Sequence, residues 1–382
     1  MKRSRTLSIA LAAVLILSMV LSACGATSGG AVKMAIIAPM TGDVATFGDA
    51  TKKGAELAIK EWNDKGGVLG QKVQWVVADG RCDPQEARNA ANKVITQDKA
   101  KFIMGEVCSS ASIPVSEVAN ANKVIQVTST STNPKVTVDE KGVVKPYTFR
   151  ACFIDPFQGT VMANFASKSL NAKTAAVLYD QGNDYVRGLA EYFIAQYEKN
   201  GGKVVVKETY TKDDTDFSAI LSKVASAKPE FLFLPDYYNK VNLIAKQAKE
   251  KGITAPMGGG DGWDSADLDV KAVDGGYYSN HYDPADPSPA VQNFLKSYGA
   301  AYKGEVPNAL ATLGYDATNM LLTGIKNAGS ADTDKVKAAL EKISFDGVSG
   351  KITLDAQHNP VKKAVIIAIK DGKKTYKETV NP

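Results

Sequence analysis

The chain alternates short apolar runs with longer amphipathic stretches. Residues 32–38 (VKMAIIA) are almost continuously apolar, which indicates a strand buried on both faces. Apolar positions in 49–65 then recur every three or four residues, as in an amphipathic helix. Further strands are expected at 72–78, 101–105 and 123–128, with helical stretches between them. This order predicts a parallel sheet with helices on both faces.

The alternation restarts after about residue 155. Strands are expected at 174–179, 203–209 and 230–234, and helices at 184–199, 217–227 and 239–251. A Pro-rich segment at 281–289 is typical of a crossover or linker. The remaining pattern predicts helices near 288–302, 309–328 and 333–342, and strands near 350–354 and 364–370. We therefore predict an α/β protein with two doubly wound, Rossmann-like units.

The N-terminal residues predict export. Basic residues at 2–5 precede an apolar stretch at 7–21, which is too short for a stable membrane span and is typical of a secretory signal peptide. The stretch ends in Leu-Ser-Ala-Cys-Gly, which resembles a bacterial lipobox cut before Cys24. We expect a signal peptide at 1–23 and a lipidated tether at 24–31, which would hold a globular body at a membrane surface. The alternative is an ordinary secretory signal with an incidental cysteine.

The composition of the chain argues against several classes of function. Of the 382 residues, 44% are hydrophobic and 23% are charged, as in an ordinary globular protein. Removing Lys2, Arg3 and Arg5 with the signal peptide leaves 43 Lys and Arg against 41 Asp and Glu, a net charge of +2. No basic field therefore argues for nucleic acid. The chain has only two histidines, His281 and His358, so a His-based metal site or a Ser-His-Asp triad is not expected.

Export makes disulfides possible. Besides Cys24, the chain carries Cys82, Cys108 and Cys152, an odd number. Cys82 and Cys108 flank one expected helix–strand unit and are the favoured pair, whose bond would stabilise the fold by about 3–4 kcal/mol. Cys152 would then be a free, buried thiol. Alternatively, all three are small buried apolar side chains.

Polar clusters follow several of the expected strands, where ligands gather in open α/β sheets. Ser109 precedes a helix, and free amides at a helix start favour a small anion such as a carboxylate. The segment 130–132 adds hydroxyls, and Asp261 supplies a carboxylate suited to an ammonium group. The set suits a zwitterion, although serine and threonine in such positions also act simply as helix caps.

Longer motifs occur in one order over essentially all of 32–382. They are GDVATFGD (42–49), GAELAIKEWNDKGGVLG (54–70), CDP (82–84), CSS (108–110), STNP (131–134), FRACFIDPFQG (149–159), DYVRGLA (184–190), DFSAIL (216–221) and DYY (236–238). With these motifs the chain resembles the leucine/isoleucine/valine-binding proteins, which are substrate-binding subunits of branched-chain amino-acid ABC transporters.

The resemblance implies the type I periplasmic binding protein fold, in which three crossover segments join two lobes and the ligand lies in the cleft. Lobe one is expected at 32–154 with 284–356, and lobe two at 155–283 with 357–382. The family's conserved disulfide matches Cys82–Cys108.

The resemblance also assigns polar ligand contacts. Ser109 would bind the ligand carboxylate, the carbonyl of Thr130 would accept from the α-ammonium group, and Thr132 would contact both charged groups. The family's acidic partner of the ammonium group is a glutamate in its best-known members and is Asp261 here. This shorter side chain is a departure that leaves the side-chain specificity open.

Four aromatic residues complete the expected site. Tyr185 and Tyr237 would line lobe two, Phe47 would lie near the ligand side chain, and Phe153, next to Cys152 at the hinge, would shape the same apolar pocket. Each has a structural alternative, as a surface tyrosine, a packing residue at a strand end or a core residue.

The expected function is that of an exported, lipid-anchored receptor for an α-amino acid, with leucine, isoleucine or valine as the first choice. It would lie at the outer face of the cytoplasmic membrane or in the periplasm, act as a monomer, and deliver its ligand to the membrane subunits of an ABC permease. We expect no cofactor, metal or nucleic acid. Alternatives are another amino acid, an amide or a urea-type ligand, or a ligand-sensing receptor domain. An enzyme is disfavoured, since the chain lacks the common nucleophile, phosphate-binding and zinc motifs.

Overall fold

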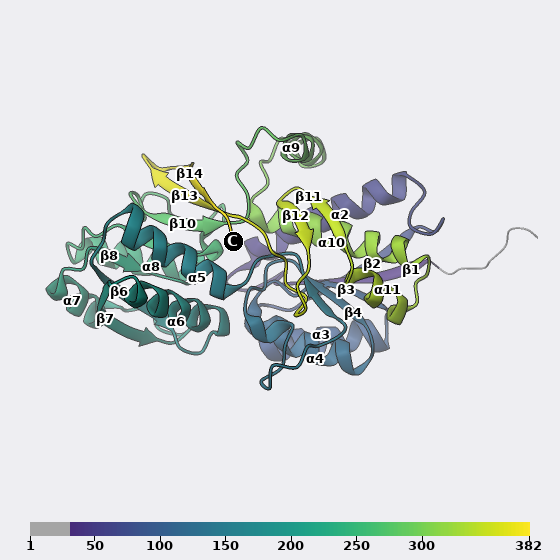
Figure 1. The fold of residues 1–382 in the computed structure, drawn as a ribbon, viewed down its shortest axis with the longest axis horizontal. Helices are drawn as coiled ribbons and strands as arrows, with labels where there is room; N and C mark the ends of the chain where they lie inside the picture. The colour runs from purple at the N-terminus through teal and green to yellow at the C-terminus, as the bar shows by residue number, and fades with distance from the viewer. Residues whose placement is uncertain (1–30) are drawn as a thin grey trace, which may run out of the picture.

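The computed structural model describes residues 31–382. The expected signal peptide at 1–23, the lipidation site Cys24 and the tether up to residue 30 lie outside the described residues. Two lobes lie side by side, one carrying β1–β4 and the other β6–β8 (Figure 1).

The first lobe is built on a five-stranded parallel sheet with the strand order β2-β1-β3-β4-β5. Its first elements are β1 (Val32–Ala38), α2 (Ala45–Asp64), β2 (Val73–Asp79), α3 (Pro84–Thr96), β3 (Phe102–Gly105), α4 (Ser109–Ala121), β4 (Ile125–Thr128), the 3-10 turn η1 (Pro134–Val136) and β5 (Thr148–Arg150). Later elements also join this lobe, namely α9 (Pro289–Ala301), α10 (Ala309–Ala328), α11 (Thr333–Leu340), and the hairpin of β11 (Ser344–Gly347) and β12 (Gly350–Thr353).

The second lobe has a seven-stranded mixed sheet with the order β14-β13-β10-β9-β8-β6-β7. Its elements are α5 (Asp155–Asn164), the π-helical turn η2 (Phe165–Ser169), β6 (Thr174–Asp180), α6 (Asp184–Lys199), β7 (Lys203–Tyr210), α7 (Ser218–Ala227), β8 (Phe231–Phe233), α8 (Tyr238–Glu250), β9 (Met257–Gly259), the 3-10 turn η3 (Asp261–Trp263), β10 (Tyr277–Asn280), β13 (Ala364–Lys370) and β14 (Lys373–Val380). Strands β6–β10 run parallel to one another, whereas β13 is antiparallel to both β10 and β14.

The chain passes between the lobes three times. It crosses from β5 to α5, from β10 to α9, and from β12 to β13, which Figure 1 shows as connections through the middle of the molecule. The α/β architecture of two lobes joined by three crossings is therefore as predicted. The residue at which each lobe ends stays a prediction.

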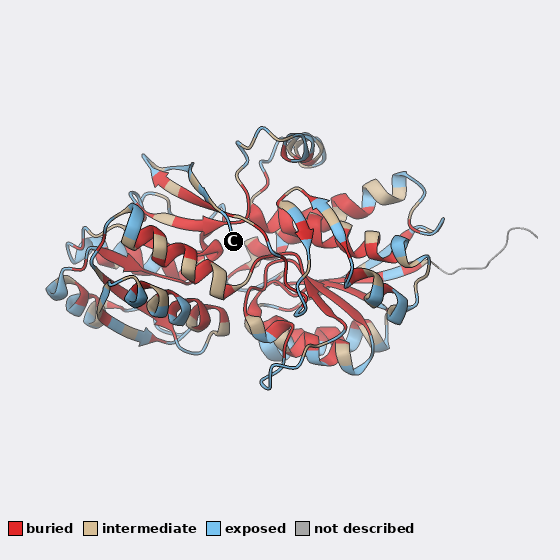
Figure 2. Cartoon of the chain, viewed as in Figure 1, coloured by how far each residue is buried: buried red, intermediate tan, exposed pale blue. Residues whose placement is uncertain are grey.

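The apolar runs in the sequence fill a core on each face of their sheet. In β1, Ile36 points into one apolar cluster and its neighbour Ile37 into another. In β6, the neighbours Val177 and Leu178 likewise point into different apolar clusters. Because side chains alternate between the faces of a strand, a sheet covered by helices on both sides needs apolar residues at every position. Figure 2 shows these central strands as buried and the outer faces of the helices as exposed.

Helices α2 and α10 pack backbone against backbone. A Cβ atom added to Gly54 would lie 1.9 Å from the carbonyl oxygen of Ala311, and one added to Gly314 would lie 2.4 Å from that of Thr51. Only glycine permits so close an approach. The contact fixes the position of α2, whose first turn carries Phe47 to the seam between the lobes.

Several elements differ from the sequence-based expectation. The helix expected from residue 49 begins four residues earlier, at Ala45. Strands β5, β9, β10, β11 and β14 were not predicted. The reasons are local: β9 (Met-Gly-Gly) has little side chain, and β14 (KKTYKETV) is mostly exposed and polar, so neither has the apolar pattern of a strand.

Candidate functional site

The start of helix α4 forms one side of the site. Cys108 is its N-cap residue but its side chain makes no cap hydrogen bond, because it is bonded to Cys82. The predicted disulfide is thus present, with 5.4 Å between the two Cα atoms. The first turn carries no acidic side chain, and Ser109 Oγ accepts a hydrogen bond from the amide of Asn133 at 3.2 Å. Helix amides without intrahelical partners and an adjacent hydroxyl make this end suited to an anion.

The loop after β4 lies against this helix start. Thr130 Oγ1 donates to the carbonyl of Val107 at 3.0 Å, which ties the loop to the β3–α4 connection. The fully buried guanidinium of Arg150 donates to the carbonyls of Ser131 and Asn133 at 2.8 and 2.9 Å. These bonds fix the backbone of the loop. Thr132 is fully buried between them, and its hydroxyl has no hydrogen-bond partner.

The opposite side of the site is a carboxylate from the second lobe. Asp261 begins η3 and is 7% exposed. Its Oδ1 accepts hydrogen bonds from Gln158 Nε2 and from the hydroxyl of Tyr185, both at 2.9 Å, and His281 Nε2 lies 3.0 Å from its Oδ2. Burial lowers the pKa of His281, so a neutral ring donates from Nε2. The three donors orient a negative charge at the seam.

A second buried carboxyl group lies behind Asp261. Asp155, the first residue of α5, is fully buried beside the side chains of Thr132 and Asn133, neither of which makes a well-formed hydrogen bond to it. Burial is the main cause that raises the pKa of Asp155 to about 8, and the charge of Asp261 adds to the effect. The site therefore contains a second carboxyl group, Asp155, whose burial favours its neutral form.

Aromatic rings close the site from both lobes. The rings of Tyr185 and Tyr237 stack with 5.2 Å between centroids and 2° between planes. Phe47 of the first lobe meets Tyr237 edge to face at 5.6 Å and Tyr238 at 5.1 Å. This contact joins α2 to the second lobe with an apolar surface.

A small cavity of about 20 Å³ lies between these groups. The residues that line it are Phe47, Val107, Ser109, Thr130, Tyr185, Tyr237, Asp261, Gly262 and Leu310. Its wall therefore combines the start of α4, the carboxylate of Asp261 and apolar side chains from both lobes. An anion-binding end, a cation-binding end and an apolar wall are chemically complementary to a small zwitterion. The cavity has to widen to admit one, because about 20 Å³ holds about one water molecule.

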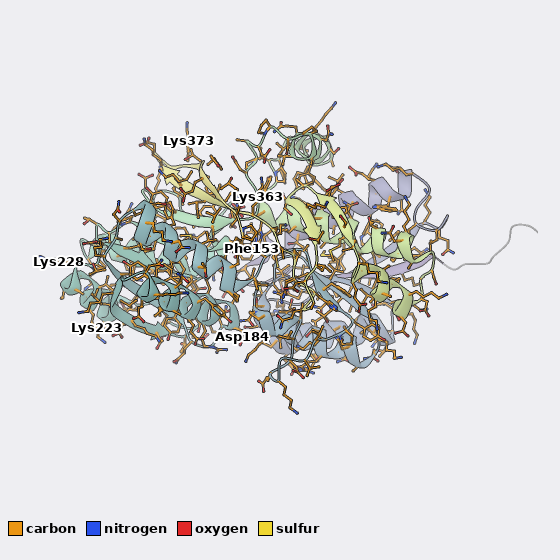
Figure 3. All side chains as sticks on the ribbon, viewed as in Figure 1. Phe153, Asp184, Lys223, Lys228, Lys363 and Lys373 are labelled. Atoms are coloured by element: carbon orange, nitrogen blue, oxygen red, sulfur yellow. A yellow bond between two sulfur atoms is a disulfide. The ribbon has the colours of Figure 1, made fainter. Side chains whose placement is uncertain are left out.

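Direct hydrogen bonds hold the two lobes together beside the cavity. Ser110 Oγ accepts from the amide of Asp184 at 2.8 Å and lies 3.0 Å from its carboxylate. Asn133 Nδ2 donates to the carbonyl of Asp184 at 2.8 Å, and Tyr238 OH donates to the carbonyl of Asp43 at 3.1 Å. Figure 3 labels Asp184 at the lower edge of the seam, opposite the first lobe. Because these bonds join the two lobes directly across the seam, the lobes are in a closed arrangement.

Six of the eight predicted ligand-binding residues line this cavity, namely Phe47, Ser109, Thr130, Tyr185, Tyr237 and Asp261. Thr132 and Phe153 are not among the residues that line it. Phe153 stacks on His281 with 3.7 Å between ring centroids, so it supports the ring that donates to Asp261. Figure 3 labels Phe153 near the middle of the molecule. That any of the eight contacts a ligand stays a prediction.

Sequence reasoning missed Gln158 and His281 as partners of Asp261, and Leu310 as part of the cavity wall. Gln158 lies in the quoted motif 149–159, which was the one available signal. His281 lies in the second crossing and gives no local sign of a role, since it meets Asp261 only through the fold.

Residues 31–382 contain neither a cluster of metal-ligating side chains nor a membrane-spanning helix. Across this range, no group of three or more His, Cys, Asp or Glu side chains is placed to hold a metal ion. None of the helices in the same range is long and apolar enough to cross a membrane.

The chain is similar to known proteins along nearly its whole length. The family described as "Periplasmic binding protein" matches residues 31–374. The leucine-, isoleucine-, valine-, threonine- and alanine-binding protein of Pseudomonas aeruginosa is 32% identical over 327 residues, which is 85% of this chain and 86% of that protein. Leu/Ile/Val-binding protein homolog 3 of Brucella melitensis is 33% identical over 351 residues, 91% of this chain and 88% of that one.

Solved structures show the same fold. A leucine-binding protein from Thermotoga maritima has a TM-score of 0.86 and 38% identity, over 92% of this chain and 99% of that chain. A branched-chain amino acid transporter substrate-binding protein from Streptococcus pneumoniae, in complex with isoleucine, has a TM-score of 0.85 and 30% identity over 92% and 100%. An ABC transporter solute-binding protein from R. palustris in complex with benzoate has a TM-score of 0.82 and 25% identity over 92% and 97%.

Proposed function

Since the chain belongs to the Leu/Ile/Val-binding family of periplasmic binding proteins, a family of binding proteins and not of enzymes, we propose that it is the extracytoplasmic substrate-binding subunit of an ABC importer. Its ligand is an aliphatic α-amino acid, with leucine, isoleucine or valine as the first choice. Relatives named for these amino acids, and the isoleucine complex of one of them, support this choice.

The observation that carries the proposal is the pairing of opposite chemistries across one cavity. The start of α4 with Ser109 lies on one wall, and the carboxylate of Asp261 lies on another. An α-amino acid has a carboxylate and an ammonium group on one carbon atom, so both ends are bound at once. The apolar wall with Phe47, Tyr237 and Leu310 then faces the aliphatic side chain.

Each polar residue has a distinct role in this proposal. Ser109 and the first amides of α4 bind the ligand carboxylate. The carbonyl of Thr130 and the carboxylate of Asp261 accept from the ammonium group. Thr132 contributes the hydroxyl that lacks a partner in the protein, a buried polar group that a ligand satisfies at no further desolvation cost.

Binding couples to closure of the lobes. Ligand first meets the first lobe through Ser109, Thr130 and Thr132, and the second lobe then brings Asp261. A ligand can favour the closed state only through contacts that it makes in that state. The hydrogen bonds between Ser110 and Asp184 join the two lobes in the closed arrangement.

The charge of Asp261 argues against cargo without an ammonium group. The R. palustris relative is described with benzoate, which carries only the carboxylate. In this chain such a ligand would leave Asp261 buried without a cationic partner, at a large cost in free energy. Another α-amino acid remains compatible with the same site, and its side chain would be selected by the apolar wall.

The proposed protein is anchored to the outer face of the cytoplasmic membrane or held in the periplasm. The lipobox-like sequence ending at Cys24 supports a diacylglycerol anchor, and residues 25–31 would provide a short tether. Labelling cells with a radioactive fatty acid tests this: label in the wild-type chain that disappears with Cys24→Ala supports the anchor, and equal label in both excludes it.

A thermal-shift panel tests the cargo. The chain from residue 25 onward is unfolded and refolded to remove carried-over ligand, then heated with each common L-amino acid, GABA, urea or benzoate. Ligand at about 1,000 times its Kd stabilises the folded state by about 4 kcal/mol, which raises the Tm by several degrees. A shift confined to leucine, isoleucine and valine supports the proposal. A shift with benzoate and with no amino acid would overturn the assigned role of Asp261.

A further inference from the structure

Glu106 is a fully buried carboxyl group directly before the anion-binding end of the site. It lies between β3 and α4 and is 0% exposed. Its Oε2 accepts hydrogen bonds from the amides of Val107 and Cys108 at 2.7 and 2.6 Å. Its Oε1 makes no well-formed hydrogen bond, and a Cβ atom added to Gly80 would lie 2.9 Å from it. The side chain is therefore held in one place.

The groups around Glu106 do not neutralise it. The carboxylate that faces it is Asp79, at the end of β2, and the loop from there contributes the amide of Cys82. The titratable group facing it from the other lobe is Tyr237, and Arg81 on the β2 loop is exposed. Within residues 31–382, none of the ion pairs includes Glu106. A buried carboxyl group without a cation favours its neutral form.

The charge of Glu106 reaches the cavity. Val107 and Ser109, one and three residues further on, both line it. Burial raises the pKa of Glu106 to about 8, although the amides of Cys108, Val107 and Cys82 act in the opposite direction. Burial also raises the pKa of Tyr237 well above its usual value, and the charges of Asp236 and Glu106 add to this. An ionised Glu106 would therefore repel an anion bound at the start of α4.

We propose that Glu106 is a positioning residue that couples ligand binding to a proton: neutral, it fixes the backbone of Val107 and Cys108 directly before α4, and with it the helix start that meets a ligand carboxylate, and ionised, it repels that carboxylate. The inference rests on the proposed function. Each ligand bound to the ionised form draws one proton from solvent onto Glu106. Affinity is consequently level at acidic and neutral pH and falls as the pH rises through the pKa of the group.

Two other buried groups titrate in the same range and must be separated from Glu106. Burial raises the pKa of Asp155 to about 8 and lowers that of Lys362 to about 8. Asp155 faces the ammonium end of the site, so ligand binding there would release a proton and mask the uptake at Glu106. Lys362 lies at the third crossing, where it donates to the carbonyl of Ala151 at 3.2 Å, and is common to all variants.

The test is isothermal titration calorimetry with L-leucine between pH 6.5 and 9, in pairs of buffers with different ionisation enthalpies. Wild type is compared with Glu106→Gln, each also in the Asp155→Asn background. The matched control is Glu117→Gln, an exposed glutamate of α4 that pairs with Arg88. Leucine's own ammonium group titrates equally in every variant.

With Glu106 present, we expect proton uptake on binding at pH 8 and roughly tenfold more loss of affinity between pH 7 and 9 than with Glu106→Gln. Glu117→Gln should behave as wild type. Leucine binding with the same proton uptake and pH profile in the presence and absence of Glu106 would overturn the inference and leave the proposed function intact. Failure of wild type to bind leucine even at pH 6.5 would instead overturn the proposed cargo and the inference with it. If Glu106→Gln does not fold, the Asp155→Asn protein is sufficient as a test. Leucine binding to Asp155→Asn at pH 8 without proton uptake would contradict the inference.

Discussion

Replacing Asp261 with asparagine tests the ammonium end of the site directly. The substitution keeps the size and shape of the side chain and removes its charge. An asparagine oxygen still accepts hydrogen bonds from Tyr185 and Gln158, whereas the contact with His281 loses its anionic acceptor. The fold should therefore persist, and the unfolding temperature without ligand should not fall much, because the variant no longer buries a charge.

The expected loss of affinity follows from the burial of the group. Asp261 is 7% exposed and faces a cavity of about 20 Å³, so a bound ammonium group would be shielded from water. A hydrogen bond between charged partners in such a place contributes about 2–3 kcal/mol, and removal of one partner leaves the other unsatisfied. This corresponds to roughly 30- to 150-fold weaker binding.

Calorimetric titration with leucine at pH 7 measures the effect. Asp213→Asn is the matched control, because Asp213 is an exposed aspartate of the same lobe and its loss changes the net charge equally. An Asp261→Asn protein that binds leucine within twofold of wild type would refute the assignment of Asp261 to the ammonium group. Equal losses in both variants would point to a general charge effect instead.

Four further predictions concern the carboxylate end, the disulfide, the helix contact and the pH dependence of stability. Ser109→Ala should weaken leucine binding at least tenfold in the same titration, and an unchanged Kd would exclude a contact with the ligand carboxylate. Replacing both Cys82 and Cys108 with serine should lower the free energy of unfolding in urea by about 3–4 kcal/mol, since the bond closes a loop across a sequence separation of 26; equal midpoints for this variant and the oxidised wild type would contradict this. Gly54→Ala should destabilise the fold by more than 1 kcal/mol, because its Cβ would lie 1.9 Å from a carbonyl oxygen of α10, and a stable variant in thermal unfolding would show that the helices can separate. Burial raises the pKa of Asp155 from 3.8 to about 8, so its contribution to stability is full below pH 3.8 and is lost as the pH rises through 8. The wild-type protein should therefore have a lower Tm at pH 8 than at pH 5.5. Asp155→Asn should reduce that difference in Tm.

Much of the fold was predictable because the relevant signals are local. The helix over 309–328 and the strand over 364–370 have the bounds expected from the sequence, since strong apolar periodicity and flanking turn residues define them. β14 could not be predicted in this way. It is exposed and polar, and it forms a strand because β13 offers an edge to pair with, which is a property of the folded sheet.

In the candidate site, too, only the residues with a local sequence signal could be predicted. Ser109 and Asp261 could be proposed from the sequence because both follow expected strands, because Ser109 lies in a family motif, and because Asp261 stands where the family has an acidic residue. The hydrogen-bond partners of Asp261 could not be predicted. Gln158 and His281 lie 103 and 20 residues away from it in the sequence and meet it only where the lobes join. The sequence likewise gave no sign that Thr132 would be left with an unpartnered hydroxyl.

By itself, the sequence determined the alternation of strands and helices, the division into two α/β units and the family to which the chain belongs. These properties depend on residue periodicity and on motifs that are contiguous in the chain. The tertiary structure alone decided which strands extend the second sheet, which donors surround Asp261, and that Glu106 is buried without a cation. Pairing and desolvation depend on residues brought together from distant parts of the chain, so no local pattern encodes them.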